Sequence, residues 1–456
     1  MGKERELWNP EAESMPAAEL ETLQLAKLKR QLLRVYNESP YYRAKFDRAG
    51  VDPERFRSLA QYRDYPYFDK DEERRSQEES KLRAGHCLGM HITCDPRLVI
   101  RISSTSGTTG RPTFTGYTQK DREAVNETGA RCLWRVGIRP GDVILHAMVL
   151  SMWIAGIPVA DMYQNFGACV VPIGALTGVE RFAQIAAEVF PKAMKCTPSY
   201  AEYLIKNLPE RAGVEARDLG IEKIMVAGEP GGSIPHIRAR IEAGFGGAKV
   251  YDSIGATGAV FSSSISCEAN AGMHFVVGDY CYFEVIDPAT LEPLPLEDGV
   301  EGEVVFTGLE KECAPLIRWR DMDIVQVFTT PCECGRPGFR YVVKGRADNM
   351  MLVRGVNAYP HAVKDVIAQF RPRVTGVMRI VLDAPLPVVQ PPVLVRAEHA
   401  SDLPAERIAP LAREIEKRIH DHLRFTARLE LVPAGSIEER RGRTHKTDLF
   451  ERRYEA

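Results

Sequence analysis

The chain has 456 residues, of which 44% are hydrophobic and 27% are charged, and its formal net charge is −2. This length can bury a sizeable core in two or three domains, and the composition is that of an ordinary globular protein. The near-neutral charge predicts no binding to nucleic acid, and no apolar run is long enough to predict a membrane span. The ten cysteines follow no disulfide spacing, which predicts free thiols in a reducing cytoplasm.

Short apolar runs alternate with amphipathic segments along most of the chain. The first predicted helix covers residues 16–38, where leucines recur at helical spacing until Pro40 ends the pattern. Further helices are predicted over residues 119–135, 153–165 and 178–190, and strands over 98–102, 143–145, 169–171, 193–194 and 223–226. This alternation predicts an α/β domain with largely parallel sheets, whose ligands bind in the loops that follow the strands.

The loop after the first predicted strand, from Ser104 to Thr113, concentrates hydroxyl and glycine residues. Glycine allows close approach of the backbone to a ligand, and successive backbone N–H groups form a concave site for an anion. We predict that the loop binds a polyphosphate, although an exposed linker would have a similar composition. The predicted phosphate contacts are Ser104, Ser106, Gly107, Thr108, Thr109 and Gly110. No Gly-Lys-Ser/Thr closes the loop, which excludes a Walker motif.

This loop resembles the phosphate loop of the AMP-forming adenylating enzymes. Thr113, where most of that superfamily has Lys, is similar to the phenylacetate–CoA ligase branch. The resemblance implies a large N-terminal adenylate-forming domain with mixed and parallel sheets, residues 1–344, and a small mobile α+β C-terminal domain, residues 345–456. It also implies ATP, Mg²⁺ and coenzyme A as cofactors, a small carboxylic acid as substrate, and a possible homodimer.

Two later segments resemble the adenine side of the family's site. Gly228, Glu229 and Pro230 follow a predicted strand, and a Gly-Glu turn brings backbone groups close to a flat ligand. The stretch from Tyr251 to Gly258 is expected to be a loop after the next strand. The resemblance implies that Asp252 faces the adenine amino group and that Thr257 contacts the α-phosphate.

The sequence departs from the family pattern Tyr-Gly-x-Ser/Thr-Glu, in which the aromatic ring stacks on adenine and the Glu helps to hold Mg²⁺. This chain has Ile254 and Gly258 at those two places. Because Mg²⁺ prefers oxygen ligands, we expect phosphate oxygens, water or Glu229 to hold it instead. The same departure is compatible with a degenerate nucleotide-binding homologue that has no ligase activity.

Four residues distant in sequence suggest a structural zinc site. A Cys-x-Cys pair before a glycine turns two thiolates toward one point, and one more Cys and one His can complete a tetrahedral set. The predicted ligands are Cys267, His274, Cys332 and Cys334. Some relatives that resemble this chain carry the same set. The alternative is four residues that never meet.

The C-terminal part contains the segment most specific to the family, from Gly345 to Pro360. By resemblance, Arg346 reaches the nucleotide, Asp348 is the hinge between domains, and Gly355 leaves room for the pantetheine arm of CoA. A strand predicted over residues 315–320 ends near Asp323, which by resemblance accepts the ribose hydroxyls.

The remaining residues predict a small α+β unit. Predicted helices cover residues 360–370 and 408–423, and predicted strands cover 374–382, 392–397 and 428–432, an order that resembles a split β-α-β unit. Adenylation needs a cation aimed at the charge that develops on the α-phosphate. The family places a Lys on this terminal loop, which implies Lys446 as the catalytic cation. Arg443 is the second candidate, and a solvated basic loop is the alternative.

The resemblance identifies the chain as an ATP-dependent, AMP-forming acyl–CoA ligase for an aryl acid or a small or hydroxylated acid. Relatives line the acyl pocket with the segment that matches residues 151–158, so Trp153 and Gly156, together with Gly255, are the predicted substrate contacts. The bulk of Met152 and Trp153 predicts a narrowed pocket that favours small or hydroxylated acids. An adenylyltransferase that never uses CoA is the alternative function.

Overall fold

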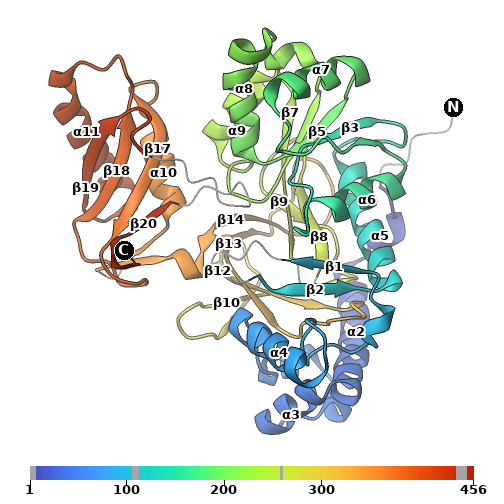
Figure 1. Ribbon diagram of the computed structural model, residues 1–456. Coiled ribbons are helices and arrows are strands. Elements are labelled where there is room, and N and C mark those ends of the chain that lie inside the picture. The colour runs from blue at the N-terminus through green and yellow to red at the C-terminus, as the bar shows by residue number, and fades with distance from the viewer. Residues whose placement is uncertain (1–6, 105–111, 257–259, 355, 438–448, 456) are drawn as a thin grey trace. The chain divides into compact units, whose positions relative to one another are not determined.

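The computed structural model describes residues 7–104, 112–256, 260–354, 356–437 and 449–455 (Figure 1). The chain divides into two compact units, each described here by itself. The first comprises Met1–Asp321 and Gln326–Val342, and the second comprises Met322–Val325 and Val343–Ala456. Within the described ranges, no helix combines the length and the apolar character needed to cross a membrane.

A mixed sheet of 12 strands forms the centre of the fold. Five neighbouring strands are parallel, in the order β7-β6-β5-β3-β4. They are β3 (Val143–His146), β4 (Cys169–Val171), β5 (Ala193–Cys196), β6 (Lys223–Val226) and β7 (Lys249–Ala256). The sheet continues through β8 (Val260–Ser266), β9 (Met273–Phe275), β10 (Cys281–Ile286), β11 (Pro293–Leu294), β12 (Glu301–Gly308), β13 (Trp319–Phe328) and β14 (Arg340–Arg346). The predicted parallel strands are therefore part of a larger mixed sheet.

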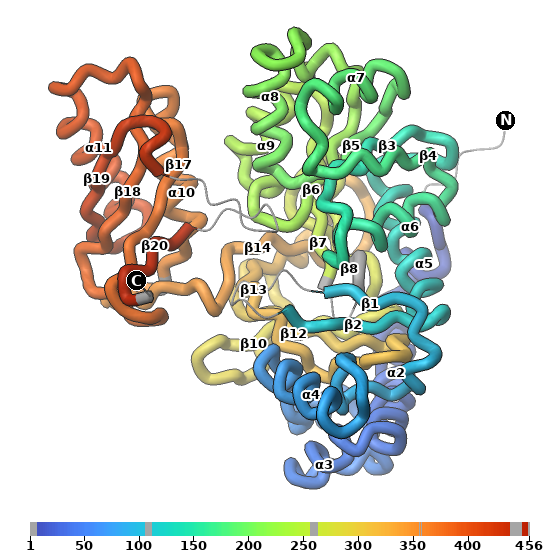
Figure 2. The backbone as a smooth tube through the Cα atoms, in the orientation of Figure 1, coloured from blue at the N-terminus to red at the C-terminus, as the bar shows by residue number. Residues whose placement is uncertain are grey.

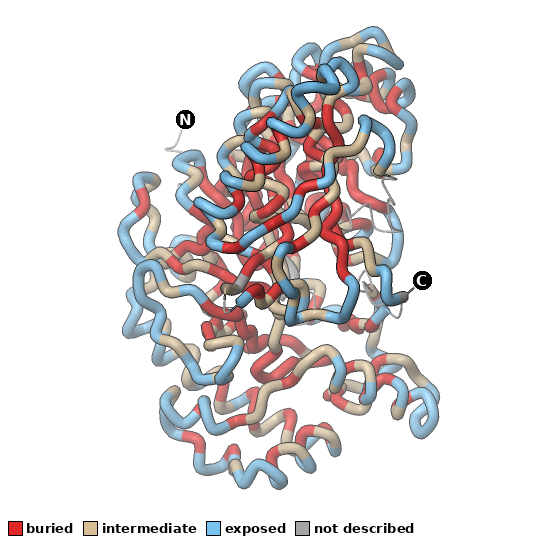
Figure 3. Tube along the Cα trace, turned by 90° about the vertical axis from the view of Figure 1, so that its left-hand side faces the viewer, coloured by how far each residue is buried: buried red, intermediate tan, exposed pale blue. Residues whose placement is uncertain are grey.

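Helices cover both faces of the parallel strands. On one face lie α7 (Val179–Val189), α8 (Pro198–Ala212) and α9 (Pro235–Gly244), whose buried residues form one core with alternate residues of the strands (Figure 1). On the other face lie α5 (Gln119–Arg135) and α6 (Ile157–Phe166), where the Tyr163 ring contacts His146 edge to face. Figure 3 shows buried segments running through the strands and exposed positions following the outer helices.

The N-terminal helices and a short hairpin complete the first unit (Figure 2). The helices are α1 (Pro10–Glu13), α2 (Ala17–Glu38), α3 (Pro40–Ala49) and α4 (Lys70–Arg83). Leu28, Leu32 and Phe46 from α2 and α3 pack in one cluster with Leu309 and Ile317. The hairpin pairs β1 (Arg101–Ser104) with β2 (Phe114–Tyr117) as an antiparallel two-stranded sheet.

The second unit has its own four-stranded sheet in the order β19-β18-β17-β20. These strands are β17 (Val374–Leu382), β18 (Val393–His399), β19 (Ala427–Pro433) and β20 (Phe450–Arg452), and they pack with α10 (Pro360–Ala368) and α11 (Ala405–Leu423). A small antiparallel pair, β15 (Met351–Val353) and β16 (Val356–Ala358), precedes α10. Short 3₁₀ turns over the two units are Pro53–Arg55, Leu59–Asp64, Pro96–Leu98, Ala216–Leu219, Ala347–Asn349 and Arg453–Glu455.

Most predicted elements are confirmed to within a few residues. Two elements in the first half of the chain begin later than predicted. The strand expected over residues 98–102 begins only at Arg101, because the Asp95 side chain caps a 3₁₀ turn over Pro96–Leu98. The helix expected over residues 153–165 begins at Ile157, because Trp153 and Gly156 close a turn in which the Gly156 N–H donates to the Trp153 carbonyl, 3.0 Å away.

Two predicted strand-to-loop boundaries are also wrong. The strand expected over residues 315–320 begins only at Trp319, because Arg318 has φ +50° and the Ile317 N–H donates to the Tyr42 hydroxyl of α3. Asp323 consequently lies inside β13 instead of at a strand end. The stretch from Tyr251 to Ala256, expected as a loop, belongs to β7, because it pairs with β8.

A buried ion pair ties α5 to the segment after β9. Arg131 is only 1% exposed, and its guanidinium donates to both carboxylate oxygens of Asp279 at 2.7 and 2.9 Å. It also donates to Glu127 at 3.0 Å and to the Val276 carbonyl at 3.1 Å. The pair therefore joins elements that are almost 150 residues apart in the chain.

We expect Arg131→Leu to lower the free energy of unfolding of the first unit by about 3–5 kcal/mol, because Asp279 is left buried without its cation. Urea denaturation followed by tryptophan fluorescence measures this unit alone, since all four tryptophans lie in it. The control is Arg211→Leu, whose partner Glu180 is exposed and whose loss should cost at most about 1 kcal/mol. Equal effects of the two substitutions would contradict the structural role.

Candidate active site

The carboxyl edge of the parallel strands brings together the predicted acyl and adenine segments. Gly228 follows β6 with φ +92°, and a Cβ there would lie 3.1 Å from Cη2 of the Trp153 indole. The positive φ favours glycine, and a Cβ at this distance would press against the indole. Trp153 and Gly228, predicted for different parts of the ligand, therefore lie against each other.

The same edge receives the end of the hairpin that carries the predicted phosphate loop. The Ser104 N–H donates to the Met152 carbonyl at 2.8 Å, and Ser104 pairs with Trp153 as an isolated parallel bridge. Across the hairpin, Ser104 pairs with Phe114, so the chain turns back between these two residues. The predicted phosphate contacts Ser106, Gly107, Thr108, Thr109 and Gly110 lie outside the described residues.

Helix α4 holds the returning strand of this hairpin. The Gln77 amide makes two hydrogen bonds with the Phe114 backbone, at 2.6 and 3.1 Å, and the buried Glu73 carboxylate is hydrogen-bonded by Thr113. Burial raises the pKa of Glu73 to about 7. The loop that precedes Phe114 is thus anchored at its C-terminal end by a buried polar contact.

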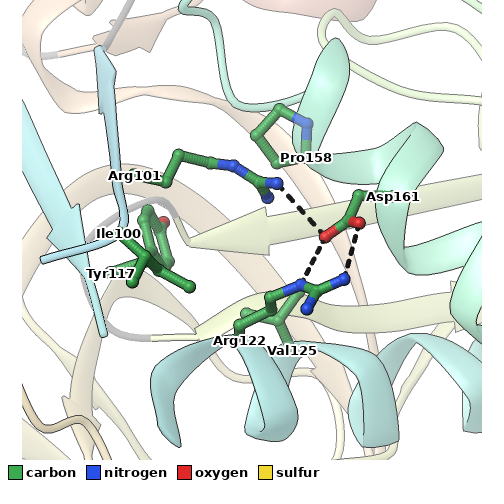
Figure 4. Close-up of a pocket in the computed structure, with 7 residues that line it drawn as sticks. All are labelled: Ile100, Arg101, Tyr117, Arg122, Val125, Pro158 and Asp161. Carbon is green, nitrogen blue, oxygen red and sulfur yellow. Dashed lines mark hydrogen bonds and ion pairs between the residues drawn. The ribbon is translucent and has the colours of Figure 1, made fainter. Parts of the chain in front are cut away.

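The other strand of the hairpin, β1, is held by ion pairs that lie in a small pocket beside it. Asp161 of α6 accepts from Arg101 at 3.2 Å and from Arg122 of α5 twice at 2.8 Å, and Figure 4 shows both guanidinium groups directed at this carboxylate. The pocket is lined by Ile100, Arg101, Tyr117, Arg122, Val125, Pro158 and Asp161. No predicted site residue lines it. Its charged groups pair with one another and connect β1 to α5 and α6.

Gly156, predicted to contact the substrate, shapes the loop that carries Trp153. A Cβ at Gly156 would lie 2.2 Å from the Val149 carbonyl oxygen, so no larger residue fits. Nε2 of the buried His146 lies 2.9 Å from the Gly156 carbonyl oxygen. Met152 is half exposed, whereas Trp153 is partly buried. His146 of β3 and the backbone just after β3 therefore hold this loop in its conformation.

The predicted adenine-side acids already have partners in the protein. Oε1 of Glu229 accepts from the Ser199 N–H in the first turn of α8, at 2.8 Å. The Asp252 carboxylate is buried and accepts from the Ser233 hydroxyl at 2.6 Å, and burial raises its pKa. Pro230, which follows Glu229, and Gly255, which lies three residues after Asp252, are partly buried. Thr257 lies outside the described residues.

In the second unit, three predicted residues form one charged group. The Arg346 guanidinium donates to Asp323 at 2.7 Å and to Asp348 at 2.9 Å. Asp323 is buried, and Asp348 lies in the short 3₁₀ turn after β14. Gly355, Arg443 and Lys446 lie outside the described residues.

The four predicted metal ligands come together in the first unit. Their ligand atoms all lie within 4.8 Å of one another. The Cys267 and Cys332 sulfurs are 3.6 Å apart, and the Cys334 sulfur is 3.4 Å from Nε2 of His274. Two ligands bound tetrahedrally at about 2.3 Å from zinc lie about 3.7 Å apart, so these spacings fit the metal. Arg135, Arg336 and Arg340 lie close enough to act electrostatically on His274, and their charges suit a set of three thiolates.

Sequence reasoning missed three polar residues that bond to segments of this region: to Thr113, to Gly156 and to Ser253. They are Glu73, His146 and Lys195, all of which are buried. A signal was present in one case, because Lys195 directly follows the strand predicted over residues 193–194, and the structure extends that strand through Lys195 to Cys196. Lys, Glu and His are seldom fully buried unless they have a specific partner or role.

Comparisons with known proteins agree with this architecture. The sequence profile of the AMP-binding enzyme family matches residues 52–310, and that of the AMP-binding enzyme C-terminal domain matches residues 355–449. The chain is 33% identical to the phenylacetate–coenzyme A ligase of Thermus thermophilus over 454 residues, which cover 96% of this chain and 97% of that one. It is 30% identical to the phenylacetate–coenzyme A ligase of Escherichia coli over 359 residues, 78% of each chain.

Among solved structures, the fold is similar to 2-hydroxyisobutyryl-CoA ligase in the postadenylation state in complex with R3-HIB-AMP. The TM-score is 0.88 and the identity 28%, with 100% of this chain and 94% of that chain covered. A large α/β unit with this mixed sheet, followed by a small unit with its own sheet, defines the adenylate-forming fold. The chain belongs to the AMP-binding enzyme family. The fold class and the family expected from the sequence are thereby confirmed.

The buried Glu73 carboxylate makes stability depend on pH. Its pKa rises from an ordinary 4.5 to about 7 in the folded chain, so the folded state binds the proton more tightly than the unfolded state. The corresponding stability is fully present below pH 4.5 and is lost as the pH rises through about 7.

We expect Glu73→Gln to remove this dependence. Relative to the unchanged chain, the variant should gain up to about 3 kcal/mol in free energy of unfolding between pH 4 and pH 8. Urea denaturation at a series of pH values, followed by tryptophan fluorescence, measures the difference. Glu188→Gln, at an exposed position of α7, is the control and should show no such gain. A constant difference between Glu73→Gln and the unchanged chain at every pH would contradict the shifted pKa.

Proposed function

We propose that this chain is an ATP-dependent, AMP-forming acyl–CoA ligase. In the first step, a carboxylate attacks the α-phosphate of ATP and gives acyl-AMP and pyrophosphate. In the second step, the CoA thiol attacks the acyl carbon and displaces AMP. The observation that carries this proposal is the contact of three segments at one sheet edge: the start of the phosphate loop at Ser104, the acyl loop at Trp153 and the adenine-side loop at Gly228.

The roles of the residues follow from this reaction. The loop after Ser104 binds the β- and γ-phosphates through backbone N–H groups and hydroxyls. Lys446, with Arg443 as the second candidate, stabilises the charge that develops on the α-phosphate, and Thr257 contacts that phosphate. Asp252 lies toward adenine.

The C-terminal residues act in both half-reactions. Asp323 accepts the ribose hydroxyls, and Arg346 reaches the nucleotide. Their ion pair at 2.7 Å supports roles at the same part of the nucleotide. We take residues 345–456 as the mobile domain, with Asp348 as the hinge residue that absorbs its rotation. Gly355 then leaves the passage for the pantetheine arm of CoA.

We expect the protein to supply few of the ligands of Mg²⁺. The family's usual carboxylate is replaced by Gly258, and one oxygen of Glu229 already accepts from the Ser199 N–H. Mg²⁺ commonly keeps several waters and binds through substrate phosphates with few protein ligands. Phosphate oxygens and water therefore supply most of its ligands here.

The acyl substrate is proposed to be a small acid, in preference to a flat aryl acid. Trp153 fills the space in front of Gly228, and Gly156 holds the loop close to β3. The likeness to a solved 2-hydroxyisobutyryl-CoA ligase at 28% identity also supports a small acid. The similarity to phenylacetate–coenzyme A ligases favours an aryl acid instead.

Cys267, His274, Cys332 and Cys334 are proposed to hold a structural zinc ion. Three sulfur donors and one nitrogen donor form a closed set that leaves no coordination position for a substrate. The site joins the turn after β8 and strand β9 to the segment before β14, so its contribution is to the fold of the first unit.

ATP–pyrophosphate exchange tests the proposed function. We expect exchange with small acids such as 2-hydroxyisobutyrate, with kcat/KM at least about tenfold above that for phenylacetate, because a missing or added group in an apolar pocket changes discrimination by about 10–200-fold. Trp153→Ala should shift the preference toward phenylacetate. Mass spectrometry should detect the acyl–CoA thioester only when CoA is present. Transfer of AMP to an alcohol, or ATP binding without exchange for any acid, would reject the ligase.

Metal analysis tests the zinc proposal. We expect about one zinc per chain, lost in the double variant Cys332→Ser/Cys334→Ser, with a lowered thermal midpoint because a structural zinc contributes directly to folding. Cys169→Ser, which removes an exposed thiol outside the cluster, is the control and should keep the metal. Purified protein that contains no zinc and takes up none would contradict the proposal.

A further inference from the structure

A buried lysine lies on a central strand of the parallel sheet. Lys195 of β5 is 5% exposed, and its Nζ donates to the Ser253 hydroxyl at 2.6 Å. Across the described ranges of the chain, no ion pair includes Lys195. An ammonium has three N–H donors, so this group has donors left over. Burial lowers the pKa of Lys195 to about 8. Asp252 acts on this ammonium electrostatically but forms no ion pair with it, and a buried cation without a directly paired carboxylate is costly unless a ligand completes its surroundings.

The neighbouring strand carries a buried histidine with a free acceptor. His146 of β3 pairs with Lys195 in register, and its ring is fully buried. Nε2 lies 2.9 Å from the Gly156 carbonyl oxygen, which can only accept, so we assign the ring proton to Nε2. Nδ1 is then an acceptor, and it is buried with no hydrogen-bond partner in the described structure. Burial lowers the pKa of His146 to about 4, which keeps the ring neutral.

Both residues support the walls of the proposed acyl pocket. His146 holds Gly156, which ends the loop of Trp153, and Lys195 holds Ser253, which precedes Gly255 on β7. Both side chains belong to the face of the sheet that α6 covers, at the carboxyl edge where ligands of parallel sheets bind. A donor and an acceptor thus belong to register partners on two paired strands, and the histidine also bonds to the acyl loop.

We propose that Lys195 and His146 recognise a hydroxyl group on the acyl chain of the substrate. The Lys195 ammonium donates to the hydroxyl oxygen, and the hydroxyl hydrogen is donated to Nδ1 of His146. A hydroxyl satisfies both groups at once, whereas a second carboxylate has only acceptors and would leave Nδ1 without a donor. An alkyl group satisfies neither. The inference rests on the proposed function, and it assigns to these two residues the preference for a hydroxylated over a plain small acid.

The test compares matched acids by ATP–pyrophosphate exchange. The probes are 2-hydroxyisobutyrate, isobutyrate, which lacks the hydroxyl, and dimethylmalonate, which replaces it with a carboxylate. A site built to bind a hydroxyl rejects analogues that lack it, so we expect the unchanged chain to prefer 2-hydroxyisobutyrate by about 100-fold or more in kcat/KM. Lys195→Met should reduce this ratio at least about tenfold, mainly through a higher KM for the hydroxy acid.

Two further variants separate recognition from folding. His146→Gln keeps an N–H donor for the Gly156 carbonyl but lacks the acceptor at Nδ1, and we expect it to reduce the same ratio. Lys192→Met removes the same ammonium from a partly exposed position just before the amino end of β5, where it pairs with Asp142, and it should leave the ratio unchanged.

The outcomes distinguish this inference from the proposed function. Exchange with no acid at all would overturn both. Exchange without preference for 2-hydroxyisobutyrate over isobutyrate in the unchanged chain would overturn the inference alone, whatever the variants do. Equal losses on both acids in Lys195→Met and His146→Gln would assign these residues a structural role, and preference for dimethylmalonate would assign Lys195 to a dicarboxylic acid. Either result would overturn hydroxyl recognition.

Discussion

The site depends on one constraint, which is that the carboxyl ends of parallel strands meet at the same edge of a sheet. The loops after β3 and β6 and the last residues of β7 therefore lie close together although they are far apart in the sequence. Two close contacts hold this arrangement: the Ser104 N–H bonded to the Met152 carbonyl, and the Trp153 indole against Gly228.

Polar side chains outside the predicted phosphate loop hold the two strands of its hairpin in place. Glu73 and Gln77 of α4 bind the backbone and side chain that follow the phosphate loop, and Asp161 binds Arg101 at the start of β1. Both strands of the hairpin are thus anchored outside the loop itself. If this loop binds a polyphosphate as proposed, anchored ends reduce the conformational freedom that it loses on binding.

The cysteine and histidine cluster shows what the fold adds to a weak sequence signal. A Cys-x-Cys pair and two distant residues can be coincidental in a sequence with ten cysteines. The antiparallel pairing of β9 with both β8 and β14 brings His274 to the same point as the three thiols, with nearby guanidinium groups that suit thiolate charge. The distances between the donors, which only the fold provides, make the set suitable for zinc.

The sequence by itself determined the class of fold and the family, because these depend on local periodicity and on short motifs such as the run from Ser104 to Thr113. It did not determine where strands end: Asp323 and the stretch from Tyr251 to Ala256 lie inside strands because cross-strand pairing, which is not local, extends them. Nor did it reveal His146 and Lys195 as neighbours. Their adjacency follows from the order in which β3 and β5 pair, and that order is a property of the tertiary structure alone.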